Sequence, residues 1–149
     1  MLALDFSLAK EWNDCCDSKS IADMAEVDLR YSVACGDFIM VINGVDCSAM
    51  WGWIPMVDMA VALSDIRDAL SGNGDASEAF EFTENEATIT FLKIGEALTI
   101  VTSYGRCEET VPFSEFDSRV QEFRDRVFRE VAARFPSLEL NEAFRSLRG

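Results

Sequence analysis

The chain of 149 residues contains no histidine. Histidine is the usual general base beside serine and cysteine nucleophiles and a frequent zinc ligand, so its absence excludes those sites. The glycine-rich motifs that bind dinucleotides or nucleoside triphosphates are missing as well. Carboxylates can still act as acids and bases, but 27 of them in one small chain leave no pair distinctive. We therefore expect no catalytic residue, no metal site and no cofactor, and a protein that is not an enzyme.

Basic side chains are scarce. The chain has 13 lysines and arginines against 27 aspartates and glutamates, which gives a formal net charge of −14. The excess lies in residues 1–97, which carry 18 acidic and 5 basic side chains. Such a surface repels phosphate backbones and anionic lipid headgroups and attracts basic proteins. We expect neither nucleic acid nor membrane as a partner, although an acidic surface also serves solubility alone.

We expect no signal peptide, no membrane-spanning helix and no disulfide framework. The first ten residues have no basic segment, and Asp5 interrupts their apolar pattern. No stretch approaches 18 uninterrupted apolar residues. The odd number of cysteines and the absence of C-x-x-C are typical of reduced thiols in a cytoplasmic protein. The cysteines are Cys15, Cys16, Cys35, Cys47 and Cys107.

Alternating apolar residues predict strands in the first part of the chain. The first is at 2–8, and two further alternations lie at 27–33 and 38–42. Gly36–Asp37 between the latter two suits a tight turn, so they are predicted to form a hairpin. Asn43–Gly44 predicts either a second turn or a bulge. Three more strands are expected further along the chain, at 79–82, 87–94 and 97–103, the last two joined by a turn at Gly95–Glu96.

Apolar residues at steps of three and four predict two amphipathic helices. The first follows Pro55, since proline is tolerated where a helix begins, and it ends at the S-G-N-G segment. The second begins at Ser114, with Asp117 three residues later as in a capping box, and Pro136 ends it. Asp58 lies off the first apolar stripe. The stripes are Met56, Met59, Ala60, Leu63, Ile66 and Leu70 in one helix, and Phe116, Val120, Phe123, Val127, Val131 and Phe135 in the other.

The order of these elements favours an α+β fold. Hairpins dominate over β-α-β units, which points to a mainly antiparallel sheet. A short third helix is expected around 140–148, and no linker divides the chain. We predict a single two-layer domain over residues 1–149, with a sheet of about six strands and two or three helices packed on one face.

Two dense groups of carboxylates are candidate partner-binding residues. Like charges so close together repel one another, and a basic partner would relieve that repulsion. The alternative interpretation is a set of well-hydrated loop edges. The candidates are Asp75, Glu78, Glu81, Glu84 and Glu86 in one group, and Asp14 and Asp17 in the other.

The segment M-W-G-W-I-P, residues 50–55, supplies the remaining candidates. Trp51 and Trp53 flank a glycine just before the first amphipathic helix. They either cap the sheet as core residues or stay exposed as anchors at a partner interface, where a large aromatic side chain is a typical hot spot. A third reading makes them the aromatic wall of a ligand site.

Several of these patterns together resemble a known kind of protein. A strand ending in V-I-N-G, a Trp-Pro entry into a helix, the run F-E-F-T-E-N-E-A-T-I-T-F and a terminal helix from F-S-E-F to F-P carry the likeness. They are similar to small acidic bacterial proteins of unassigned function, some of which are thought to be immunity proteins of toxin–immunity systems. The resemblance spans about residues 25–140 and contains no diagnostic motif, so it assigns no role to any residue. It implies a cytoplasmic protein that binds a toxin and blocks its active site.

Three functions stand as hypotheses. The first is an immunity-type protein that neutralises a basic toxin domain by stoichiometric binding through its acidic clusters. The second is a small-ligand-binding or enzymatic domain that uses the Trp51 and Trp53 region. The third is a subunit of a larger complex. The acidic charge without histidine or a catalytic motif favours the first.

Overall fold

The computed structural model describes residues 1–9 and 22–149. Strands and helices alternate in blocks along the chain, as in the α+β class that the sequence predicts. The elements are β1 (Leu2–Leu8), α2 (Glu26–Tyr31), β2 (Cys35–Ile42), β3 (Val45–Asp46), β4 (Ala49–Pro55), α3 (Met56–Leu70), β5 (Ala76–Glu81), β6 (Thr88–Ile94), β7 (Ala97–Thr102), β8 (Glu108–Pro112), α4 (Phe113–Arg134), the 3-10 helix η2 (Pro136–Leu140) and α5 (Glu142–Arg148).

The strands of the described residues form two antiparallel sheets. In the first, β2 pairs with β1 on one side, and β3 and β4 share its other side. In the second, β5, β6, β7 and β8 lie in that order. The α+β class is confirmed, but the described residues form eight strands in two sheets where we expected about six in one. The sequence did not predict β3, β4 and β8. These strands are short or irregular and show no clear alternation of apolar and polar residues.

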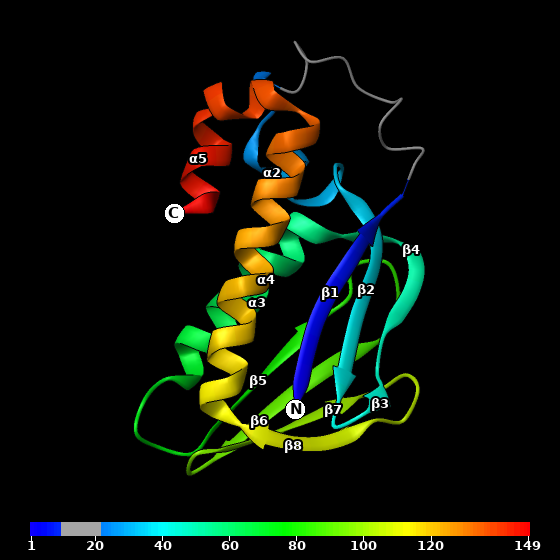
Figure 1. Ribbon diagram of the computed structural model, residues 1–149, viewed down its shortest axis with the longest axis vertical. Coiled ribbons are helices and arrows are strands. Elements are labelled where there is room, and N and C mark those ends of the chain that lie inside the picture. The colour runs from blue at the N-terminus through cyan, green and yellow to red at the C-terminus, as the bar shows by residue number, and fades with distance from the viewer. Residues whose placement is uncertain (10–21) are drawn as a thin grey trace.

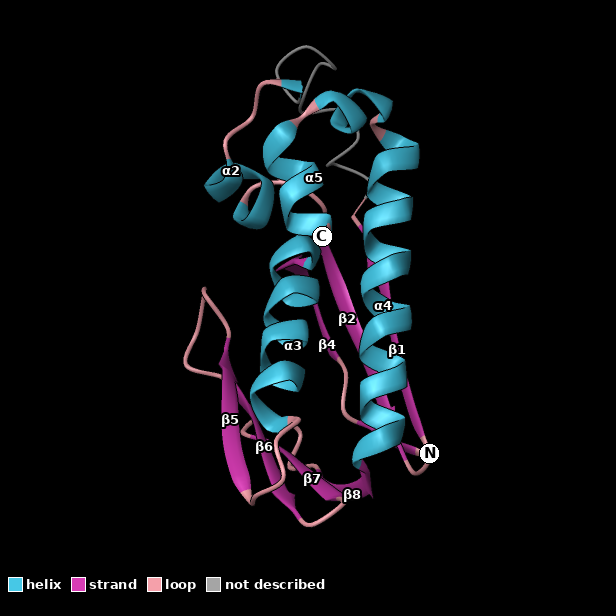
Figure 2. Ribbon diagram, turned by 90° about the vertical axis from the view of Figure 1, so that its left-hand side faces the viewer, coloured by secondary structure: helices cyan, strands magenta, loops and turns pink. Residues whose placement is uncertain are grey.

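Helices α3 and α4 join the two sheets around one core. Figure 2 shows them side by side, with β1, β2 and β4 behind them and β5–β8 below. Figure 1 shows the same arrangement from the side of β1, with α4 running from the lower end of the molecule to α5. The ring of Phe123 on α4 lies 5.7 Å from Phe38 of the first sheet, and Phe116 lies 5.3 Å from Phe91 of the second. All twelve residues of the two predicted apolar stripes are buried.

The helix ends differ from the prediction in one respect. Ser114 does not cap α4; Pro112 holds the N-cap position and no side chain caps the helix there. Proline at the entry suits both α3 and α4, because its fixed φ leads the chain from a strand into a helix. The third helix is confirmed as α5, where the Asn141 side chain accepts a hydrogen bond from the Phe144 amide at 3.0 Å.

The prediction of a strand over residues 27–33 was wrong. They form helix α2 and a turn, not a strand. Leu29 and Val33 are buried, whereas Val27 and Tyr31 are 61% and 41% exposed. The buried pair is four residues apart, so the segment fits a helical period as well as a strand period, and its short length left the choice open.

Gly36 and Asp37 lie inside β2 and form no turn. A Cβ on Gly36 would stand 1.8 Å from the backbone oxygen of Ser7, so only glycine allows β1 and β2 to pair here. The true hairpin turn of this sheet is Asn43–Gly44 between β2 and β3, with φ of 53° and 83°. Two positive φ values are the signature of a tight two-residue hairpin, so this predicted turn is confirmed.

Cys47 and Cys107 form a disulfide, which corrects the expectation of reduced thiols for these two residues. They are separated by 60 residues, so their contact is a product of tertiary structure. The bond ties the β3–β4 connection of the first sheet to the β7–β8 connection of the second. Cys35 is the free cysteine of the described residues, and Cys15 and Cys16 lie outside them. Among the described helices, none has the length and apolar character needed to cross a bilayer.

Candidate functional site

The two tryptophans lie in a bulge of β4. Ala49 pairs with Phe38 and Ile54 pairs with Gly36, so residues 50–53 have Asp37 alone opposite them. The Asp37 carboxylate accepts a hydrogen bond of 2.8 Å from the amide of Gly52, which has a φ of 79°. Glycine adopts this conformation readily, and the bonded carboxylate holds the bulge in place.

The bulge directs Trp51 into an aromatic cluster. Its ring stacks on Trp53 at 5.4 Å and meets Phe82 and Tyr104 edge-on at 4.9 and 5.1 Å. The Tyr104 hydroxyl donates to the Cys47 carbonyl at 3.2 Å, and burial raises the pKa of Tyr104. Both tryptophans are partly buried against the core. Trp51 is therefore mainly a packing residue between the two sheets, while one ring face of Trp53 is covered by Trp51.

A hollow of about 540 Å³ lies beside Trp53, and we call it the Trp53 hollow. The hollow lies between the end of α2 and the turn that joins β5 to β6. Figure 2 shows this turn extending toward α2. Desolvation by burial, together with the charge of Glu84, raises the pKa of the Cys35 thiol. Glu84 from the first acidic group and Trp53, two of the predicted binding residues, therefore line the same hollow. Its lining residues are Tyr31, Cys35, Trp53, Glu84 and Asn85.

A second hollow of about 350 Å³ continues along β5 and shares Tyr31 with the first. Among its carboxylates, Asp58 is 5% exposed, although it lies off the predicted apolar stripe of α3. The Nη2 and Nε of Arg30 both donate to Oδ1 of Asp58, at 2.7 and 3.0 Å. Burial lowers the pKa of Arg30, and the hydrogen bonds and charge of Asp58 outweigh that effect, so the pKa is raised. Arg30 is the only basic side chain among the described residues that line this hollow, and Asp58 neutralises it. Asp65 and Glu81 form no ion pair among the described residues.

The five carboxylates of the first candidate group follow one edge of the second sheet. Figure 2 shows β5 as the outer strand of this sheet, and β6 is its one strand neighbour in the described chain. Glu78 and Glu81 are three residues apart on a strand and so point to opposite faces. Asp75 accepts a hydrogen bond from the Gly95 amide at 3.0 Å. All five are exposed, and only Glu84 lines the same hollow as a tryptophan. Asp14 and Asp17 lie outside the described residues.

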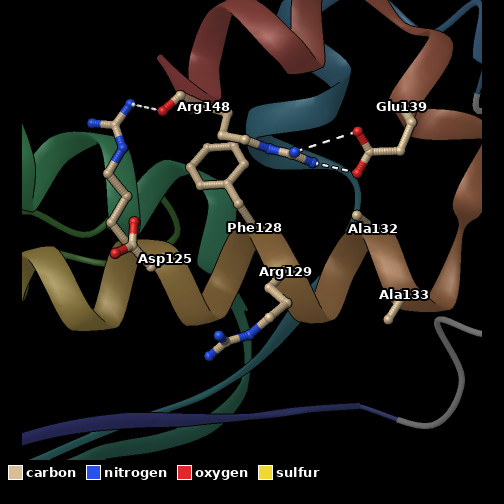
Figure 3. A pocket seen from close by; sticks show the side chains of 8 residues that line it. Asp125, Phe128, Arg129, Ala132, Ala133, Glu139 and Arg148 are labelled. Atoms are coloured by element: carbon tan, nitrogen blue, oxygen red, sulfur yellow. Dashed lines mark hydrogen bonds and ion pairs between the residues drawn. The ribbon is translucent and has the colours of Figure 1, made fainter.

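A separate hollow of about 380 Å³ lies between α4 and the C-terminal helices (Figure 3). Arg148 donates to both carboxylate oxygens of Glu139, at 2.7 and 3.3 Å, and this pairing lowers the pKa of Glu139. Arg124 donates to the carbonyls of Leu147 and Arg148, and its guanidinium lies over the ring of Phe128. These charges fasten η2 and α5 onto α4, which makes this hollow a structural junction.

Tyr31 is a site residue that the sequence did not indicate, as are Cys35 and Asn85. It lines both hollows along β5 and is exposed. A strand over 27–33 would have placed it on the same buried face as Leu29 and Val33. The spacing of four between those two residues was the signal that could have found it, because a helix turns Tyr31 to the opposite side.

Comparison of the chain with models of protein families, with curated proteins and with solved structures finds no match. The resemblance to immunity proteins therefore stays a prediction. Among residues 1–9 and 22–149, no three cysteine, aspartate or glutamate side chains are grouped so that they could hold a metal ion.

Proposed function

We propose that this protein binds a basic protein domain and neutralises it stoichiometrically, in the manner of an immunity protein that blocks a toxin. The observation that carries the proposal is that Glu84 and Trp53 line one hollow, next to a second hollow lined by Asp65 and Glu81, which form no ion pair within the described part of the chain. A desolvated aromatic ring supplies affinity at an interface, and surrounding carboxylates steer a cationic partner and fix its orientation. The net charge of −14 acts in the same direction over longer distances.

The test measures binding to a purified toxin domain of basic charge, by calorimetry at 50 and at 300 mM salt. Replacing Glu78, Glu81 and Glu86 by glutamine removes three charges from the β5 edge and its turn. We expect this variant to bind more weakly and with a smaller salt dependence, because fewer opposite charges are then screened. Equal affinity of the variant and the wild type would reject binding through this edge.

A matched control removes the same number of charges elsewhere on the second sheet. Glu96 lies in the β6–β7 turn, and Glu108 and Glu109 lie on β8, the strand at the opposite edge from β5. The triple replacement of these residues by glutamine makes the net charge less negative by the same three units. It separates an effect of the binding face from an effect of overall charge, since only the latter would weaken both variants alike.

A second candidate function is the binding of a small ligand in the Trp53 hollow. Its volume of about 540 Å³ lies within the range of ligand pockets, and Trp53 offers an apolar wall. A thermal-shift screen against a metabolite collection distinguishes this function from protein binding. A ligand that raises the melting temperature of the wild type but not of a Trp53→Leu variant would support it, and no stabilising ligand would count against it.

The cytoplasmic location is also part of the proposal. The Cys47–Cys107 disulfide bears against it, because cytosolic thiols are normally kept reduced. Alkylation of free thiols in intact cells, followed by mass spectrometry of the two cysteines, decides between a reduced and an oxidised pair.

A further inference from the structure

We propose that the Trp53 hollow receives one arginine side chain of the partner, with the guanidinium on the open face of Trp53 and its charge paired with Glu84. This inference rests on the proposed function, since it names the chemistry that the binding face recognises. It adds a specific anchor to a surface that is otherwise defined by its charge.

The walls of the hollow suit a planar cation. Trp51 stacks on one face of Trp53 at an interplanar angle of 18°, and Trp53 lines the hollow. Tyr31 adds a second ring. Tryptophan is the aromatic side chain that attracts cations most strongly, through the negative potential of its ring face.

The charged group at the hollow is the Glu84 carboxylate, and among the described residues no lysine or arginine lines it. The Asn85 amide oxygen already accepts a hydrogen bond from the Ala87 amide at 2.9 Å, so Glu84 is the acceptor left for a cation. Glu84 forms no ion pair among the described residues. A guanidinium fits this set better than an ammonium does, because it is flat, weakly hydrated and able to stack while donating in its own plane.

The protein itself contains the same arrangement a few residues away. The Arg30 guanidinium lies 5.6 Å from the ring centre of Tyr31 and donates to Asp58 at 2.7 Å. This internal arginine lines the neighbouring hollow together with Tyr31 and Asp58. Among the described residues, the lining of the Trp53 hollow has the ring and the carboxylate without an arginine.

The test titrates the full chain with the tripeptide acetyl-Gly-Arg-Gly-amide and with its citrulline counterpart, which has the same shape without the charge. Binding is followed by NMR at the indole N–H signal of Trp53, identified as the signal lost in a Trp53→Phe variant. We expect the arginine peptide to shift this signal saturably and the citrulline peptide to leave it unchanged. Equal shifts from both peptides, or no saturable shift from either, would overturn the assignment.

A pair of variants tests the role of the carboxylate. Glu84→Gln should weaken binding of the arginine peptide by about threefold or more, the factor expected for an exposed ion pair. Glu108→Gln, on β8 at the opposite edge of the second sheet and also exposed, should leave the affinity unchanged. Equal affinities of Glu84→Gln and the wild type would reject the pairing. Both residues are exposed and neither forms an ion pair among the described residues, so the variants are expected to fold.

The two proposals can fail separately. The charge variants at Glu78, Glu81 and Glu86 do not alter the residues that line the Trp53 hollow. Partner binding that depends on those charges, together with no arginine binding at Trp53, would remove the anchor and keep the proposed function. Arginine binding at Trp53 without binding of the basic domain would do the reverse.

Discussion

Removing the disulfide between Cys47 and Cys107 should destabilise the fold strongly. The perturbation is the double replacement of both cysteines by alanine, or reduction of the wild type. The bond closes a loop of 60 residues that connects the two sheets. In the chain-entropy model, the loss of a cross-link of that span lowers the free energy of unfolding by about 4 kcal/mol.

The expected loss of stability comes mainly from the entropy of the unfolded chain and less from any contact in the fold. An open chain of 60 residues between two points gains conformations that the cross-linked chain cannot reach, so the unfolded state becomes more favourable. For a protein of this length, about 4 kcal/mol corresponds to a fall in melting temperature on the order of 10 °C. The loss should also loosen the Tyr104 contact with the Cys47 carbonyl, and with it the cluster around Trp51.

The assay is urea unfolding with and without reductant, followed by tryptophan fluorescence. The double variant should behave alike in both conditions, and a Cys35→Ala variant should show the full effect of reductant, because Cys35 takes no part in the bond. An unchanged midpoint for the reduced wild type would refute the reasoning. So would mass spectrometry that finds both thiols free in the non-reduced native protein.

Three further predictions concern single side chains. Arg30→Met should lower the free energy of unfolding in urea by about 3 kcal/mol, because Asp58 is then buried without its partner. Replacing Asp58 by leucine in the same variant should restore most of that loss. Gly36→Ala should cost about 3 kcal/mol or more, since its Cβ would stand 1.8 Å from a backbone oxygen of β1, whereas Gly74→Ala has open space and should change stability little. Burial raises the pKa of Tyr104 above that of a tyrosine in the unfolded chain. Tyr104 should therefore make its full contribution to the free energy of unfolding below about pH 10, and that contribution should fall as the pH rises further. Tyr104→Phe should remove that dependence, and an equal alkaline slope in the variant would contradict the assignment.

Long periodic segments were predictable because their pattern alone decides their structure. The stripes of α3 and α4 bury one side chain in every three or four, and only a helix places all of them on one face. Strand β1 and the pair β6 and β7 alternate over six or seven residues, and the turns at Asn43–Gly44 and Gly95–Glu96 have residues that favour positive φ.

Short segments were decided by their neighbours. Residues 27–33 fit two periods, and α2 forms because the Arg30 guanidinium finds Asp58 on α3 while Leu29 and Val33 enter the core. Gly36 looked like a turn residue, yet it serves the close approach of two backbones, which is visible only once β1 lies beside β2.

The sequence by itself determined the α+β class, the two long helices, the acidic charge and the identity of most candidate binding residues. All of these depend on composition or on spacing within one segment. Only the tertiary structure decided that Trp51 packs inward while Trp53 lines a hollow, that Glu84 joins it there, and that Cys47 meets Cys107. Those contacts join residues 31 to 60 positions apart, and no local pattern encodes them, because they result from the way two sheets close around α3 and α4.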